Sequence, residues 1–111
     1  MVISTIRMAI PAAKHNDALK ILRSIAGQSR DDQGCISYSV YRDIEDDNVL
    51  MIQGNWKSEE NMDQHVRSDE YRNLLLVLEM SLKQPEIRFD TISSSAGIET
   101  IEEIRSTIHM E

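Results

Sequence analysis

The chain has 111 residues, a formal net charge of -7 and 41% hydrophobic residues. This length suits one domain with a modest core, and the composition is typical of a folded protein rather than a disordered one. Affinity for nucleic acids comes mostly from Lys and Arg neutralising phosphates, so the acidic balance argues against a nucleic-acid partner.

Two features bear on where the protein works. Cys35 is the one cysteine, which excludes an intramolecular disulfide and a zinc cluster of thiolates, and which fits a reducing compartment. Residues 1–7 lack the charged region and long apolar stretch of a signal peptide, and no apolar run has the length needed to cross a bilayer. We therefore expect a cytoplasmic protein without a membrane partner.

The chain begins with a predicted strand and a predicted helix. Residues in Val2–Ile10 alternate between two sets with period two, which predicts a strand that ends before Pro11. From residue 16 to residue 26, apolar side chains recur every three or four positions, which predicts a helix. His15 or Asn16 lies where the N-terminal cap of that helix belongs.

Two further strands follow, joined by a short acidic turn at residues 43–48. Residues 35–42 and residues 49–57 both alternate, and the second of these strands closes at Trp56. On the first of them, the positions predicted to face the helices are Ile36, Tyr38 and Val40. On the second, they are Leu50, Ile52, Gly54 and Trp56.

The next stretch is predicted to be helical in two pieces. Ser58 has the position of a helix cap with two glutamates after it, and Ser68 has the position of a second cap. The apolar residues after Ser68 at helical spacing are Tyr71, Leu74, Leu75, Leu78 and Leu82. A last strand starts at Pro85, and we expect Tyr71 and Phe89 to lie in the core.

The order of elements is βαββαβ, which predicts an α+β fold of the ferredoxin-like kind over residues 1–93. In this fold a four-stranded antiparallel sheet has its helices on one face. The other face is left bare and includes Val49 and Met51. A second copy of the sheet would cover it, so we expect a homodimer through this face, a dimeric α/β barrel.

Residues 94–111 form a predicted extension. A turn-like stretch leads into a narrow apolar stripe at helical spacing, made of Ile98, Ile101, Ile104 and Ile108. The extension either packs on its own domain or reaches across to clasp a partner subunit, and the sequence leaves both interpretations open.

Four short stretches carry a resemblance to a known family. They are Gly34–Tyr38, Arg42–Asp43, Asn55–Glu60 and His65–Ser68. With these stretches, residues 2 to 92 resemble the antibiotic biosynthesis monooxygenase domain, and the most specific pair is Trp56 with His65 nine residues later. The resemblance implies a sheet-to-sheet dimer with a pocket between each sheet and its own helices. Some members oxidise phenols or quinols with molecular oxygen and no cofactor, whereas others open haem or isomerise small carbonyl sugars.

Three side chains are the candidates for the site. His65 could remove a phenolic proton near neutral pH, since its ordinary pKa is about 6.5; alternatively it is a half-exposed surface histidine. Trp56 could floor a pocket for a flat substrate or simply fill the junction of strand and helix. Tyr38 could donate a hydrogen bond to an oxyanion, although a tyrosine on a strand is more often packing. For Cys35 we expect a small, buried residue rather than a reactive thiol.

Two departures from the family pattern narrow the chemistry. Phenol-oxidising relatives carry an asparagine four residues before the strand tryptophan, where this chain has Ile52. Haem-degrading relatives use a histidine ligand ten residues after a tryptophan aligned with His65, where this chain has Leu75. A metal site is not expected either, because the three histidines, His15, His65 and His109, are scattered over three elements.

The sequence therefore supports three interpretations of function. The first is a cofactor-independent monooxygenase that acts on a small quinol or phenol, with His65 as the base and Trp56 and Tyr38 contacting the substrate. The second is an isomerase of a small phosphorylated carbonyl compound, in which His65 shuttles a proton. The third is a non-catalytic binding or assembly domain, which a structure without an open cavity beside Trp56 and His65 would favour.

Overall fold

The structure is a computed structural model that describes the fold of residues 1–108 and the side chains of residues 1–106. His109, one of the three histidines considered above, lies outside the described residues. The elements are β1 (Val2–Ala9), the short 3-10 helix η1 (Ala12–Lys14), α1 (His15–Ser29), β2 (Cys35–Arg42), β3 (Val49–Trp56), α2 (Glu59–Arg67), α3 (Tyr71–Glu79), β4 (Glu86–Thr91) and α4 (Ile98–Ile108).

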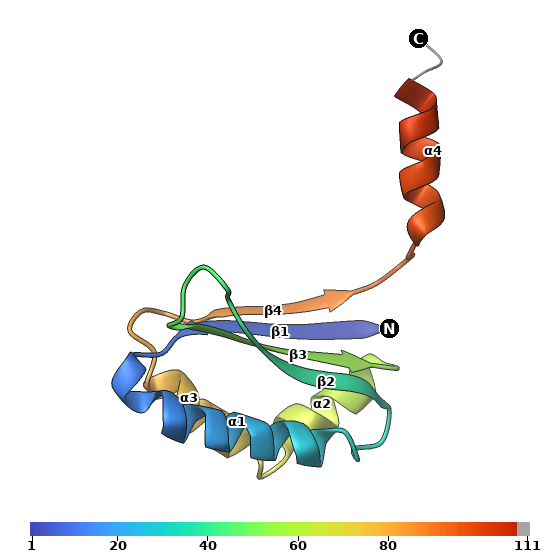
Figure 1. Cartoon of the computed structure of the whole chain (residues 1–111). Coiled ribbons are helices and arrows are strands. Elements are labelled where there is room, and N and C mark those ends of the chain that lie inside the picture. The colour runs from blue at the N-terminus through green and yellow to red at the C-terminus, as the bar shows by residue number, and fades with distance from the viewer. Residues whose placement is uncertain (109–111) are drawn as a thin grey trace.

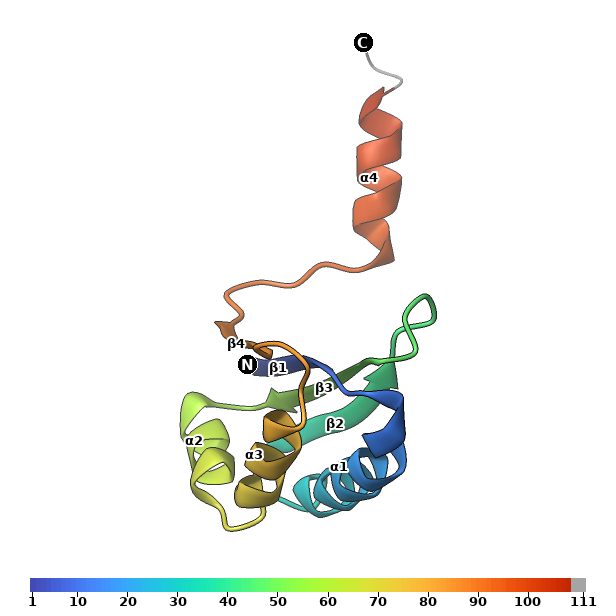
Figure 2. The same cartoon turned by 90° about the vertical axis from the view of Figure 1, so that its left-hand side faces the viewer.

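The four strands form one antiparallel sheet in the order β2-β3-β1-β4. Helices α1, α2 and α3 all lie against one face of this sheet, and α3 lies between the other two (Figures 1 and 2). The described helices leave the opposite face of the sheet uncovered (Figure 1). The prediction of an α+β, ferredoxin-like fold is confirmed.

The core lies between the sheet and these three helices. On β1 the alternation predicted from sequence puts Val2, Ser4, Ile6 and Met8 inside. The strands β2 and β3 contribute Tyr38, Leu50, Ile52 and Trp56, and the helices contribute Ala18, Leu22, Ile25, Met62, Leu74 and Val77. Burying these side chains stabilises the fold by roughly 25 cal/mol for each Å² of apolar surface removed from water.

The predicted faces of β2 are wrong at its first residues. The register pairs Cys35 with Trp56 and Ser37 with Asn55, so Ile36 is an extra residue in a β-bulge. Because the bulge breaks the alternation, Ile36 is 52% exposed, whereas Cys35 packs against the core. Tyr38 and Val40 keep their predicted inward positions.

Two predicted helix caps are also wrong. The first helix follows η1 directly, and Lys14 at its N-cap makes no side-chain capping bond; His15 instead places Nε2 2.6 Å from the carbonyl oxygen of Ile10. Ser68 closes α2 rather than opening α3, since its hydroxyl donates to the carbonyl oxygen of His65 at 2.6 Å. The cap at Ser58 is as predicted, and its oxygen accepts from the backbone N–H of Asn61 at 3.2 Å.

The end of the domain is more exposed than the sequence suggested. Leu74 and Val77 are the buried residues of α3, whereas Leu75 is 48% exposed and Leu82 lies beyond the end of the helix. Phe89, which we expected in the core, is 48% exposed because β4 is an edge strand. Tyr71 is partly buried and packs against the core, as expected.

The predicted amphipathic extension forms the helix α4. It stands clear of the domain, on the side of the sheet opposite to α1, α2 and α3 (Figures 1 and 2). Its isoleucines Ile98, Ile101 and Ile104 are all exposed. A helix of eleven residues is marginal alone in water, so tertiary packing normally stabilises such a segment.

Candidate active site

Trp56 ends β3 deep inside the domain, where no part of it is exposed. Its Nε1–H donates a hydrogen bond of 3.3 Å to the hydroxyl of Ser4 on the neighbouring strand. The hydroxyl of Ser4 in turn lies 3.5 Å from the carbonyl oxygen of Gly54. The polar edge of the indole is therefore satisfied within the sheet, and its ring face is left for packing.

Gly54 lets two aromatic rings converge from adjacent strands. A Cβ atom at this position would meet the ring of Tyr38 at 2.8 Å and Nε1 of Trp56 at 2.9 Å. Only glycine leaves that space free. The ring centroids of Tyr38 and Trp56 lie 6.2 Å apart, edge to face.

His65 comes to the same point from α2. Its ring centroid lies 4.6 Å from that of Trp56, 5.3 Å from that of Tyr38 and 5.4 Å from that of Tyr71. His65 is 3% exposed, so it is not the half-exposed surface histidine that the sequence left open. The structure thus brings together all three candidate residues, and Tyr71 joins them.

Asp32 is a member of this cluster that the sequence analysis missed. Its Oδ2 lies 3.4 Å from Nδ1 of His65. The residues are 33 positions apart, and the carboxylate belongs to the polar turn before β2. A local pattern relates only residues a few positions apart, so nothing in the sequence pointed to this pair.

The turn that holds Asp32 depends on Gly34. The φ angle of Gly34 is +78°, in the left-handed region that favours glycine. A Cβ atom here would also collide with the side chain of Asn61 in the first turn of α2. The carbonyl oxygen of Gly34 accepts from the backbone N–H of Lys57 at 2.9 Å, which fastens the turn to the end of β3.

We expect Gly34→Ala and Gly27→Ala to change the free energy of unfolding in opposite directions. At Gly34 the left-handed backbone alone costs alanine about 1–2 kcal/mol, and Asn61 must also move. Gly27 lies inside α1 with free space around its Cβ position, so alanine there stabilises by roughly 0.5–1 kcal/mol. Urea denaturation of both variants measures the two effects, and a shift of the same sign in both would contradict this account.

The protonation states follow from burial. Burial lowers the pKa of His65, and the hydrogen bond and negative charge of Asp32 oppose this shift. Burial raises the pKa of Tyr38 and of Tyr71 above the ordinary value of a phenol. At neutral pH the cluster therefore holds a neutral imidazole, which can accept a proton, beside phenols that stay protonated and can donate a hydrogen bond.

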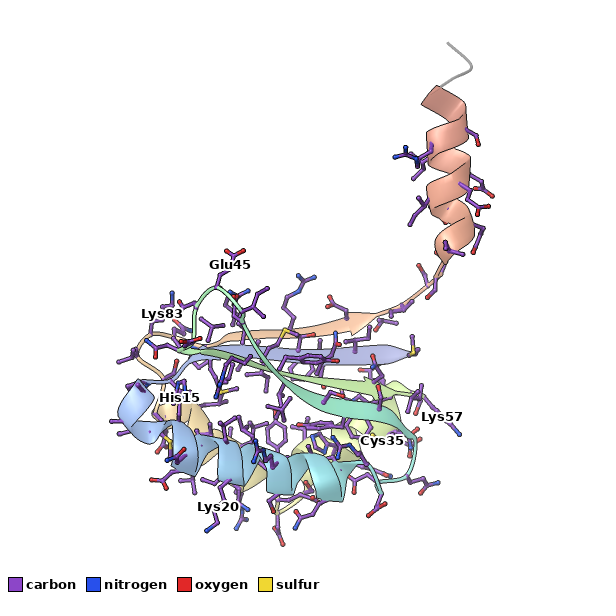
Figure 3. All side chains as sticks on the ribbon, viewed as in Figure 1. His15, Lys20, Cys35, Glu45, Lys57 and Lys83 are labelled. Carbon is purple, nitrogen blue, oxygen red and sulfur yellow. The ribbon has the colours of Figure 1, made fainter. Side chains whose placement is uncertain are left out.

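A small hollow opens at the rim of the cluster. Its volume is about 110 Å³, and it is lined by Asp32, Gln33, Asn61, Gln64, His65 and Ser68. Of the three candidate residues His65 alone lines it. Figure 3 shows side chains filling the layer between the sheet and the helices, with Cys35 at the same end of the sheet as Lys57.

The remaining candidates contribute little chemistry. Cys35 is partly buried, and burial together with the charge of Asp32 raises its pKa, which disfavours the reactive thiolate. Ile52 is buried in the core, and Leu75 is half exposed on α3. Within residues 1–106, the side chains of His, Cys, Asp and Glu form no group of three that could hold a metal ion. The described helices also include none with the length and apolar character needed to span a membrane.

Comparison with known proteins identifies the family of this chain and several structures with the same fold. None of the curated protein sequences matches this chain. Among solved structures, a conserved protein from Methanosarcina mazei Go1 is 27% identical, with a TM-score of 0.75 over 81% of this chain and 91% of the other.

Two more distant structures share the fold. One is an antibiotic biosynthesis monooxygenase, 15% identical, with a TM-score of 0.76 over 85% of this chain and all of the other. The second is a variant of SnoaB, a cofactor-independent oxygenase from Streptomyces nogalater. It is 13% identical, with a TM-score of 0.72 over 85% of this chain and 94% of the other.

The family model described as antibiotic biosynthesis monooxygenase matches residues 1–75, which include Asp32, Tyr38, Trp56, His65 and Tyr71. This match covers well over half of the chain, and the fold agrees with it. The chain belongs to the antibiotic biosynthesis monooxygenase family.

Proposed function

We propose that this protein is a cofactor-independent monooxygenase that oxidises a small quinol or phenol with molecular oxygen. The observation that supports it most is the imidazole of His65, which is buried with its ring centroid 4.6 Å from that of Trp56 and which lines a polar hollow. Family membership and the likeness to SnoaB, which is a cofactor-independent oxygenase, are consistent with this chemistry.

In the proposed reaction, His65 takes the hydroxyl proton of the substrate and leaves an electron-rich phenolate. The phenolate passes one electron to oxygen, and the resulting radical and superoxide combine at a ring carbon as a peroxide. The proton on His65 returns to the peroxide. Loss of water then breaks the O–O and C–H bonds, so one oxygen atom ends in a quinone carbonyl and the other in water. The protein's part is deprotonation, orientation and exclusion of water.

The size and lining of the hollow favour a small substrate with polar groups. At about 110 Å³ it is smaller than the engineered apolar cavity of ~150 Å³ that holds benzene, so a single ring fits only in part. The lining has carboxamides and a hydroxyl that could bond to substrate hydroxyls. The described residues that line it include no Lys or Arg, which an isomerase of a phosphorylated compound would need to bind its phosphate.

Oxygen uptake with a panel of small quinols and phenols tests this proposal. A catalytic rate above the uncatalysed background, with the matching quinone as product, is the expected result. Turnover of a substrate under strict exclusion of oxygen would instead favour the isomerase. No uptake with any substrate would discard the monooxygenase.

A second candidate is a non-catalytic binding or assembly domain. It is favoured by the burial of Trp56 and Tyr38, neither of which lines the hollow at His65. The exposed isoleucines of α4 also offer a surface for association. Absence of any turnover together with stable self-association would support this candidate.

We also propose that two copies pair through the uncovered sheet face. This face carries Met51 and Tyr41 beside Arg7, and they line an open hollow of about 210 Å³ together with Arg42, Asp43 and Val49. A second copy packed on this face would remove the side chains of Met51, Tyr41 and Val49 from water. The family relationship implies the same pairing.

Met51→Glu should convert this dimer to a monomer, because it places a charge on the face of each subunit that the pairing would bury. Leu76→Glu is the matched control: Leu76 is 52% exposed on α3, which lies against the opposite face of the sheet, so a charge there should not affect the pairing. Sedimentation or light scattering should give twice the chain mass for the wild type and the control. A dimeric Met51→Glu protein, or a monomeric wild type, would contradict the proposal.

A further inference from the structure

The carboxylate of Asp32 meets the ring of His65 from a separate loop. Its Oδ2 lies 3.4 Å from Nδ1, and the two side chains differ in exposure, at 31% for Asp32 and 2% for His65. The carboxylate thus keeps part of its hydration at the rim of the cluster, while the imidazole is fully inside. This arrangement directs the carboxylate of Asp32 at one nitrogen of the ring, Nδ1.

The backbone on both sides of Asp32 is tied down. Its N–H donates to the carbonyl oxygen of Ser29 at 3.0 Å, and its own carbonyl oxygen accepts from the N–H of Cys35 at 3.1 Å. Two residues later, Gly34 has a left-handed backbone, and its missing Cβ leaves room for the side chain of Asn61 on α2. The loop that carries Asp32 is therefore fixed by its own backbone hydrogen bonds and packs closely on the helix that carries His65.

We propose that Asp32 is a positioning residue, which holds the proton of neutral His65 on Nδ1 and so leaves the Nε2 lone pair to act as the base. A neutral imidazole carries its proton on either nitrogen, and an acceptor beside one of them selects that tautomer. This role rests on the proposed function, since it matters for catalysis only where His65 is the base. Asp32 also stabilises the imidazolium that forms when the base has taken its proton.

The neighbouring titratable groups do not replace Asp32 in selecting the tautomer of His65. Tyr38 on β2 and Tyr71 on α3 are phenols whose pKa is raised by burial, so they stay uncharged. Glu70, just before α3, has its pKa raised by burial and by the charge of Asp32. One oxygen of Glu70 is buried and finds no hydrogen-bond partner among the described residues. The carboxylate that lies against the ring of His65 is that of Asp32, with 3.4 Å between Oδ2 and Nδ1.

Nitrogen NMR of the full chain tests the role without any substrate, because the ¹⁵N shifts of a histidine report both its tautomer and its pKa. In the wild type, neutral His65 should carry its proton on Nδ1. Asp32→Asn keeps an acceptor oxygen but loses the charge, so the tautomer should persist while the pKa of His65 falls. Asp32→Ala loses both, so the pKa falls and the Nε2–H tautomer appears.

Asp31→Asn is the control, since it removes a neighbouring exposed carboxylate and should change neither property of His65. The proposal is overturned if the wild type carries the proton on Nε2, or if both Asp32 variants match the wild type in tautomer and pKa. If the alanine variant fails to fold, Asp32→Asn still tests the effect of the charge on the pKa of His65.

Measurements of catalytic activity provide a second test of the role of Asp32. Both Asp32 variants should lose about 10- to 100-fold in kcat with little change in KM, which is less than the loss of the base itself. If the wild-type chain oxidises no quinol, the proposed function fails, and the tautomer measurement still decides whether Asp32 orients His65. If the variants keep full kcat on a good substrate, the positioning role fails and the proposed function stands.

Discussion

His65→Ala should reduce the oxygen consumption of this protein by about 100-fold or more, in line with the usual contribution of a general base. The imidazole is the buried group of the cluster that is neutral and able to take a proton at pH 7, since the pKa of His65 is lowered and Tyr38 and Tyr71 stay protonated. The measurement is kcat from oxygen uptake, with the best quinol as substrate. His65→Gln should be as inactive while preserving more of the packing.

His15→Ala is the matched control for this experiment. His15 lies at the start of α1, where its ring contacts the carbonyl oxygen of Ile10 rather than the cluster. Its loss should leave kcat within a small factor of the wild type. A His65→Ala protein with wild-type kcat would remove the base from the proposed reaction.

The lowered pKa of His65 also sets the pH dependence. Because the folded pKa lies below the value of about 6.5 for an exposed histidine, the imidazole stays neutral into mildly acidic solution, and kcat should persist there. The unfolded chain binds a proton first as the pH falls. The stability contributed by neutral His65 is therefore fully present above pH ~6.5 and declines from there down to the folded pKa. His65→Gln should lack this part of the acid sensitivity.

Trp56→Ala should cost about 3–5 kcal/mol in the free energy of unfolding, as for other buried tryptophans. No part of Trp56 is exposed, and alanine would leave a cavity against His65 and Tyr38 and remove the partner of Ser4. A domain of this size has only about 5–15 kcal/mol of total stability, so the variant should be near the limit of folding.

Urea denaturation followed by circular dichroism measures the effect, because Trp56 is the only tryptophan and its fluorescence is lost with it. Phe89→Ala is the control, since this aromatic ring is 48% exposed on an edge strand and should lose far less. Equal losses in the two variants would show that burial of Trp56 does not dominate the stability of this end of the sheet.

The main elements of this protein could be predicted from local patterns. The alternation along residues 2–9 reflects a strand with one face on a core, and the cap at Ser58 reflects donors that the first turn of a helix leaves unpaired. These signals act between residues only a few positions apart. They were therefore correct for the order of elements and for the approach of Trp56 and His65 to one end of the sheet.

The predictions failed where distant parts of the chain decide the outcome. A single extra residue in β2 turned Ile36 outward and Cys35 inward, and no local pattern announces a bulge. Ser68 could cap either neighbouring helix, and the geometry of the break between α2 and α3 selected the first. Phe89 has the pattern of a core residue, but the position of β4 at the edge of the sheet leaves it half exposed.

The candidate site shows the same division. The amino-acid sequence by itself determined the fold class and supplied Tyr38, Trp56 and His65, because period and motif place each of them on its own element. Only the tertiary structure decided that Asp32 contacts His65, that Gly54 makes room for the rings, and that the hollow reaches His65 but not Trp56. Contacts across 33 positions and the space left between packed side chains depend on how all the elements meet, which no local pattern records.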